Sequence, residues 1–235
     1  MTTTSAFPVS IGGVRLWRAA SPDDKAPAEF LKPRDRRRLS ALGRAAFTVL
    51  KPFMTGAEVL DADKDAVLFV SRFGDLALTA GLLDDMRDPD GLSPTAFSTS
   101  VHNAVGGLFT ILTGFQGHVS AMGAGEAGVS AALVEAASLL TEFERVVLCV
   151  YDAESPEVFR GTHPENRTFA VALEVRRADA GSAEAVRFTV EPGLLPATND
   201  VMRPLEAVPF LTGETDRWVE DAEGVRTVWT RGSAR

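Results

Sequence analysis

The sequence contains one cysteine, Cys149, among its 235 residues. A lone cysteine forms no disulfide within the chain, and its position in the apolar run RVVLCVYD predicts a buried strand. No apolar run approaches the roughly 20 residues that a membrane-spanning helix needs. The N-terminus, MTTTSAFPVS, has neither the basic segment nor the long apolar segment of a signal peptide. We therefore expect a cytoplasmic protein without a membrane span.

An excess of basic residues is also missing. Thirty-two Asp and Glu residues against 24 Lys and Arg residues give a net charge of −8. Nucleic acids and anionic membranes bind surfaces with a local basic excess, so we expect no nucleic-acid partner. A hydrophobic content of 45% suffices for a sizeable core, and the sequence shows no repeat or linker. We expect one domain across residues 1–235.

Strand-like and helix-like segments alternate along the chain. The runs DAVLFVSR and RVVLCVYD are typical of strands that are covered on both faces. Helices are expected within residues 25–50, 75–86, 95–114 and 124–140. Further on, TFAVALEVRR and AVRFTVE predict two strands around a turn, and DRWVEDAEGVRTVWTR alternates like an edge hairpin. This order predicts an α/β fold with a mixed sheet.

A glycine-rich turn follows the short strand candidate HVSAM. Gly123, Gly125 and Gly128 spell G-x-G-x-x-G between this strand and a helix, and the next strand ends at Asp152. That order matches the dinucleotide-binding fingerprint, in which the helix N-terminus holds a pyrophosphate. Two features disfavour it: HVSAM is short and partly polar, and the carboxylate of Glu126 would share the positive end of the helix dipole.

A second interpretation rests on the longer stretch from Ser93 to Leu140. It resembles the N-terminal half of a β-ketoacyl-acyl-carrier-protein synthase, and in particular the short ketosynthase-like family of type II fatty-acid and aryl-polyene-type pathways. The matching features are an Asn followed by small residues and spaced glycines, then a strand, a sharp turn and a helix: Asn103, Gly107, Gly114 and Gly117. RRRLSALGRAAF, VLFVSRFGDL and VVLCVYDAESPE also look like segments of this family.

The resemblance implies an α/β fold that is half of a thiolase-type pair, with a mixed sheet and a buried helix. It assigns Asn103, Gly107, Gly123 and Gly125 to the packing of the turn and its helices. It implies no cofactor and no metal.

In catalytic members of this family the turn presents a cysteine at a helix N-terminus, where the dipole lowers the thiol pKa. The resemblance places Glu126 at that position, and no residue from 123 to 127 is Cys, Ser or Thr. The family's two catalytic histidines and its lysine lie in a C-terminal half that we do not expect in this chain. His102, expected within a helix, and His118 and His163 do not replace them. The resemblance thus implies a non-condensing accessory protein, a pseudoenzyme.

Glu126 has two interpretations. A carboxylate can act as a base, and loading synthases of the superfamily, with Gln at this position, decarboxylate a malonyl thioester. The helix dipole would keep Glu126 ionised, however, so it would repel the malonyl carboxylate. In the other interpretation Glu126 caps free N–H groups at the start of the helix.

Two kinds of partner follow from the resemblance. Synthases of this fold pair across a twofold axis through an edge strand, here GFQGHVSAM, so we expect a homodimer or a heterodimer with a ketosynthase. The cluster Arg36, Arg37 and Arg38 either docks an acidic acyl carrier protein or forms a solvated helix face.

Overall fold

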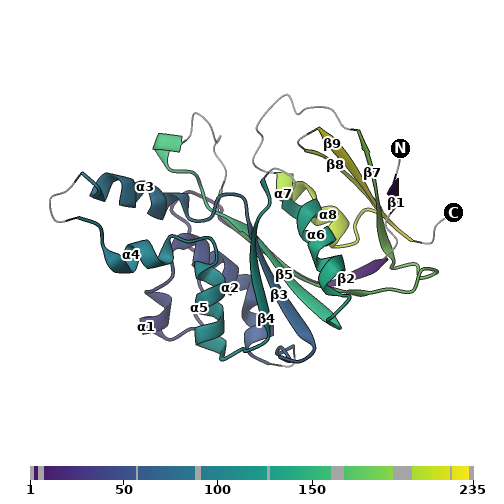
Figure 1. Cartoon of the computed structure of the whole chain (residues 1–235), viewed down its shortest axis with the longest axis horizontal. Helices are drawn as coiled ribbons and strands as arrows, with labels where there is room; N and C mark the ends of the chain where they lie inside the picture. Colours follow the sequence, from purple (N-terminus) through teal and green to yellow (C-terminus); the bar gives the residue numbers. More distant parts are fainter. Residues whose placement is uncertain are drawn as a thin grey trace.

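One mixed sheet runs through the part of the chain that the computed structural model describes, namely residues 3–4, 8–56, 58–87, 91–125, 128–159, 167–192, 203–222 and 224–232. Its nine strands follow the order β4-β3-β5-β6-β2-β7-β9-β8, with β1 beside β7 (Figure 1). They are β1 (Thr3–Thr4), β2 (Val9–Arg18), β3 (Asp65–Ser71), β4 (His118–Gly123), β5 (Arg145–Asp152), β6 (Phe169–Arg177), β7 (Val186–Pro192), β8 (Arg217–Ala222) and β9 (Val225–Arg231). β3 is parallel to both β4 and β5, and the other pairs are antiparallel.

The two strands with continuous apolar sequences form the centre of the core. Every residue of β3 and β5 is buried, which confirms the prediction that both faces of these strands are covered. On one face, Leu68 and Leu148 belong to a cluster that also contains Leu133 of the helix after the glycine turn. On the other face, Phe69 and Cys149 pack in a second cluster with apolar residues of the helices before β3 and β4.

The described helices are α1 (Pro33–Arg36), α2 (Ala41–Met54), α3 (Leu76–Asp85), α4 (Pro94–Thr99), α5 (Ala104–Thr113), α6 (Gly128–Leu139), α7 (Arg203–Glu206) and α8 (Val208–Leu211), with a 3₁₀ turn η2 (Glu157–Phe159). None of these described helices is both long enough and apolar enough to cross a bilayer.

Two of the expected helices are divided. Within residues 25–50, α2 starts only after Ser40, whose Oγ accepts a hydrogen bond from the Gly43 N–H, so this serine sets the helix N-terminus. Within residues 95–114, α4 ends near Ser100, whose Oγ donates to the Phe97 carbonyl, and α5 starts at Ala104. The prediction of one continuous helix over residues 95–114 was wrong.

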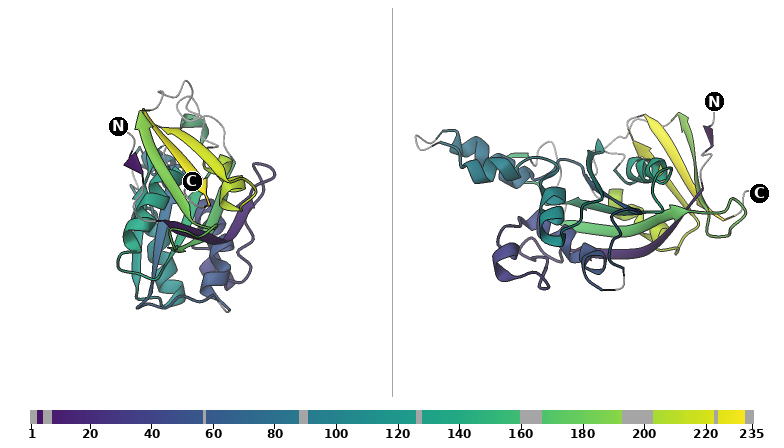
Figure 2. Two further views of the ribbon diagram at one scale, coloured as in Figure 1. Left: turned by 90° about the vertical axis from the view of Figure 1, so that its right-hand side faces the viewer. Right: turned by 60° about the horizontal axis from the view of Figure 1, so that its bottom comes forward.

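The sheet curls around α6 and covers it from two sides. Strands β3 and β5 lie on one side of the helix, and β7, β8 and β9 lie on the other (Figures 1 and 2). The indole Nε1 of Trp229 in β9 donates to Ser130 Oγ of α6 at 2.8 Å, and both residues are buried. The predicted edge hairpin is formed by β8 and β9, and it covers the predicted buried helix.

Candidate functional site

The parallel strands β3, β4 and β5 end at the same edge of the sheet, with Ser71, Gly123 and Asp152 as their last residues. The glycine turn follows β4 at this edge. Gly125 has a φ of +53°, in the left-handed region that glycine adopts without steric cost. Because open α/β sheets bind ligands outside the carboxyl ends of their strands, this edge is the candidate site.

Ser71 and Asp152 form a buried hydrogen-bonded pair at this edge of the sheet. Asp152 Oδ1 accepts hydrogen bonds from Ser71 Oγ at 2.8 Å and from the Arg72 N–H at 2.9 Å. Ser71 Oγ in turn accepts from the Gly74 N–H at 2.9 Å. Burial raises the pKa of Asp152 to about 6, although the bonds from Ser71 and Arg72 and the Arg72 charge oppose the rise. Ser71 is 1% and Asp152 6% exposed, so the pair is enclosed and positions the loop after β3.

His102 holds this loop against the glycine turn. It lies in the turn between α4 and α5 and not inside a helix, contrary to the expectation from the sequence. Its Nε2 is 3.0 Å from the Met122 carbonyl, and because a carbonyl only accepts, Nε2 carries the hydrogen. A Cβ added to Gly74 would lie 3.1 Å from His102 Nδ1, and one on Gly123 would lie 3.6 Å from Cε1. The close packing at Gly74 and the hydrogen bond to Met122 make His102 a bridge between the two loops.

Two of the residues expected to pack α5 against its neighbours, Asn103 and Gly107, are exposed. Gly107 is exposed, and a Cβ added there meets no atom within 4 Å. The close approach lies one residue earlier, at Gly106, where a Cβ would be 3.2 Å from the side chains of Phe69 and Val119. Asn103 is exposed and precedes α5 without forming a side-chain cap. The expected packing contact at Gly107 is therefore made by Gly106.

A cavity of about 330 Å³ lies between α5 and the edge strand β4. Asn103, Gly107 and Ser120 are among the residues that line it. Ser120 Oγ is buried and has no hydrogen-bond partner among the described residues. The cavity therefore borders the edge strand, whereas the Ser120 hydroxyl itself is enclosed.

The remaining sequence candidates lie elsewhere. Cys149 is fully buried in the middle of β5, and burial raises the pKa of its thiol. His118 is exposed at the start of β4, the end of the strand opposite the glycine turn, with its ring 5.3 Å from that of Phe143. Glu126 and His163 lie outside the described residues. Among the residues that are described, no group of His, Cys, Asp or Glu side chains is arranged to hold a metal ion.

The strand order disfavours the dinucleotide interpretation. In that fingerprint, the two strands joined by the helix after the glycine turn are neighbours. Here α6 leads from β4 to β5, but β3 lies between these strands and β4 is at the edge of the sheet. Asp152, the acidic residue at the end of the second strand, is buried, and its carboxylate accepts hydrogen bonds from Ser71 and from the Arg72 N–H.

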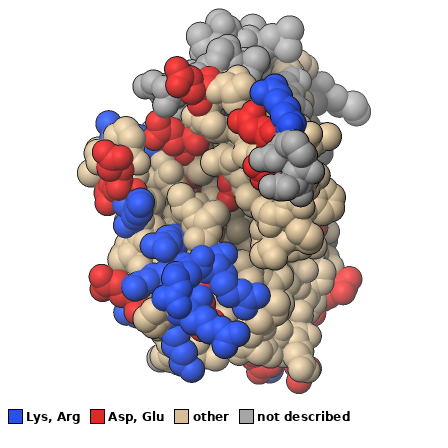
Figure 3. Space-filling view, turned by 90° about the vertical axis from the view of Figure 1, so that its left-hand side faces the viewer, with Lys and Arg blue, Asp and Glu red and all other residues tan. Residues whose placement is uncertain are grey.

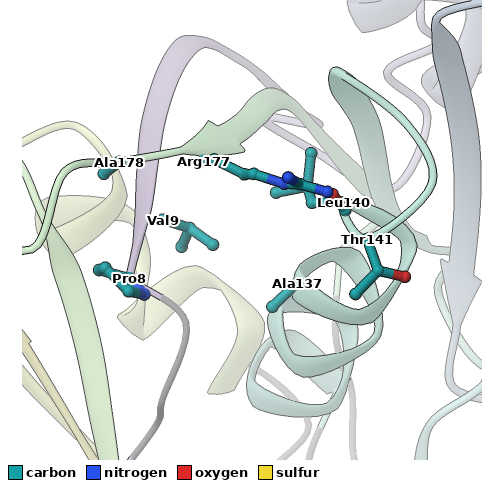
Figure 4. A pocket seen from close by; sticks show the side chains of 7 residues that line it. All are labelled: Pro8, Val9, Ala137, Leu140, Thr141, Arg177 and Ala178. Atoms are coloured by element: carbon teal, nitrogen blue, oxygen red, sulfur yellow. The ribbon is translucent and has the colours of Figure 1, made fainter.

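Two further surface features lie away from the glycine turn. Basic side chains gather on the face that contains α1 (Figure 3), where Arg37 and Arg38 are exposed and Arg36 is half-buried. At the C-terminal end of α6, an apolar cavity of about 340 Å³ is lined by Val9, Leu140 and other residues (Figure 4). Arg177 lies across this cavity and donates from Nε to the Leu140 carbonyl, which neutralises the negative end of the helix dipole.

The comparisons with known proteins agree with this geometry. The family model for the N-terminal domain of β-ketoacyl synthase matches residues 15–229. The chain matches no curated protein. Among solved structures, it is similar to a chain in the complex of a ketosynthase (ApeO) with its chain length factor (ApeC) from Xenorhabdus doucetiae. The TM-score is 0.72 at 23% identity, over 91% of this chain and 87% of that chain.

Two more distant structures share the fold. One is a chain of AntDE:AntF, a type II polyketide synthase acyl-carrier protein with its ketosynthase, at a TM-score of 0.61 and 15% identity over 89% of this chain and 75% of that chain. The other is a β-ketoacyl synthase from Burkholderia phymatum, at a TM-score of 0.55 and 12% identity over 88% and 70% of the two chains. The family model spans most of the sequence, and the sheet with its glycine turn and buried helix has the thiolase-like fold of these structures. The chain therefore belongs to the β-ketoacyl synthase family, through the N-terminal domain of that family.

Proposed function

We propose that this chain is a non-condensing, ketosynthase-like accessory subunit of a type II polyketide or fatty-acid-type pathway. The observation that carries the proposal is the position of its one thiol. Condensation by this family uses a thiolate at the glycine turn, but Cys149 is buried in β5 and residues 123–128 contain no Cys, Ser or Thr. A chain of this composition cannot hold the growing acyl group as a thioester at that turn.

The free edge of the sheet supports a synthase as partner. Within the described residues β4 pairs only with β3, and its residues are exposed or half-buried. An edge strand offers unpaired N–H and C=O groups to another strand, and the cavity between α5 and β4 borders this edge. A chain of similar length and fold occurs in the ketosynthase and chain length factor complex, because the alignment covers nearly equal shares of the two chains. The partner we propose is a full-length ketosynthase that supplies the nucleophile.

The basic cluster at the C-terminal end of α1 supports a carrier protein as second partner. Arg36, Arg37 and Arg38 follow one another on a face where basic side chains gather (Figure 3), although the chain as a whole is acidic. A local basic surface on an acidic protein steers an acidic partner to that surface. A structure with this fold also contains an acyl-carrier protein bound to its ketosynthase.

The non-condensing role is tested by the mass of a malonyl-loaded carrier protein after incubation with the purified chain. We expect the malonyl mass to remain: without an accessible thiol the chain cannot condense, and an ionised Glu126 would repel the malonyl carboxylate and so disfavour decarboxylation. A Glu126→Ala variant is measured in parallel. A change to the acetyl mass that disappears in this variant would instead make the chain a malonyl decarboxylase with Glu126 in the reaction.

Carrier-protein docking is tested by binding of the same carrier protein to an Arg37→Glu/Arg38→Glu variant. We expect the dissociation constant to rise about tenfold, with a weaker effect at high salt. Arg217→Glu reverses one exposed charge on β8, at the other end of the molecule, and is the control. The double variant changes the net charge by twice as much as this control. A control that loses half as much binding free energy as the double variant would therefore show that only net charge matters, and would contradict docking at the basic cluster.

A further inference from the structure

Helices α3 and α4 form an arm that extends from the sheet and carries an unusual amount of exposed apolar surface. Its exposed side chains include Leu83 at 52%, Met86 at 66% and Phe97 at 60%. Leu92, Val101 and, on the neighbouring α5, Ile111 are also exposed. Side chains of this size and exposure present on the order of several hundred Å² of apolar surface, the extent at which an exposed patch marks a protein contact.

The apolar sequence of α3 does not match the exposure of this helix. The sequence LALTAGLLDD is apolar at six of its first eight positions, yet of its ten residues only Leu82 is buried. α4 has no buried residue. Helices of six to ten residues are marginal in water by themselves and depend on packing of an apolar face. A helix that is apolar on most of its surface is normally enclosed, so the arm has the composition of an element that another chain covers.

The position of the arm indicates which chain covers it. In Figure 1 and in the right-hand view of Figure 2, α3 and α4 extend on the side of the sheet that ends in β4, away from β8 and β9. α4 contacts α5, on which Ile111 is 64% exposed, and α5 contacts β4, so α5 lies between the arm and the edge strand. A subunit that extends the sheet past β4 would therefore lie against the arm.

We infer that the α3–α4 arm is a docking arm that packs its exposed apolar side chains on the partner ketosynthase. This inference rests on the proposed function, since it takes its partner from there. Met86 and Phe97 are the two most exposed of these side chains on the arm, and burying them would contribute a large part of the contact. The β4 edge provides backbone pairing, and the arm provides the apolar area.

The test co-expresses the tagged chain with each full-length β-ketoacyl synthase of the source genome and measures the dissociation constant of the complex that forms. A Met86→Asp/Phe97→Asp variant is expected to bind about tenfold or more weakly. Val225→Asp changes an exposed valine on β9, at the opposite end of the molecule, and is expected to bind as the unmodified chain does. Circular dichroism verifies that both variants fold.

Hydrogen exchange on the unmodified chain provides a second readout that does not depend on the variants. The amides of residues 76–86 and 94–101 should exchange more slowly once the synthase is bound. A complex that forms with normal affinity in the arm variant, and without protection of these amides, would refute the docking arm and leave the proposed function intact. If no synthase binds the unmodified chain, the proposed function and the docking arm are both refuted.

Discussion

The buried carboxyl group of Asp152 should make the stability of the protein depend on pH in a defined window. An unfolded aspartate titrates with a pKa near 3.9, whereas burial raises the pKa of Asp152 in the folded protein to about 6. Between these two values the folded protein holds a proton that the unfolded chain has lost. The free energy of unfolding therefore falls as the pH rises through this window, and the stabilisation by the protonated group is lost above about pH 6.

The size of the effect follows from the difference between the two pKa values. About two pKa units at 1.36 kcal/mol per unit give a loss on the order of 3 kcal/mol between pH 4 and pH 7. Asp152→Asn removes the titration, while its side-chain carbonyl still accepts the hydrogen bonds from Ser71 Oγ and the Arg72 N–H. Relative to the unmodified protein, the variant should thus gain about 3 kcal/mol as the pH rises from 4 to 7.

Urea denaturation followed by circular dichroism, at a series of pH values, measures this difference directly. Other titrating groups contribute equally to both proteins, so the difference between the two curves isolates Asp152. Curves that remain parallel from pH 4 to pH 7 would refute the argument, because they would mean that Asp152 titrates as an ordinary exposed aspartate.

Three further predictions concern packing and reactivity. Arg145→Met removes the cation that pairs with Asp65, a carboxylate that is 4% exposed, and should lower the free energy of unfolding by about 3–5 kcal/mol; an unchanged urea midpoint would contradict a buried ion pair. Gly117→Ala places a Cβ 2.7 Å from the Ala62 carbonyl oxygen and should cost roughly 1–3 kcal/mol in the same assay, whereas a neutral result would mean that this loop adjusts freely. Cys149 should react with a thiol reagent only when the protein unfolds, because its thiol is fully buried; labelling of the native protein at the rate of a free thiol would disprove this placement.

The sequence predicted the elements that are defined by local patterns. The apolar runs DAVLFVSR and RVVLCVYD became β3 and β5, and the alternating C-terminal segment became the β8–β9 hairpin. The prediction of one helix over residues 95–114 was wrong because a long-range contact interrupts it. His102, in the turn between the two helices, bonds to the Met122 carbonyl, twenty residues away. The curl of β7, β8 and β9 over α6 also depends on distant pairs, such as Trp229 with Ser130, which no local pattern indicates.

The candidate site was predicted in part. The sequence located the glycine turn between a strand and a buried helix, and the structure places it at the carboxyl edge of the parallel strands. The pair formed by Ser71 and Asp152 was missed, although each is a polar residue at the end of an apolar run, which is a visible signal for a strand end at a site. Gly106 and Gly107 were indistinguishable by sequence, because the rotation of α5 against Phe69 decides which glycine is buried.

The function that we propose for this chain is to support condensation without performing it. The most direct test is the acyl mass on a carrier protein after reaction of malonyl-loaded carrier protein with an acyl-primed partner synthase, with this chain alone, or with both. We expect no elongated product with this chain alone, and a product with both proteins that differs in yield or length from that of the synthase alone. Elongation by this chain alone, or identical products with and without it, would contradict the proposed function.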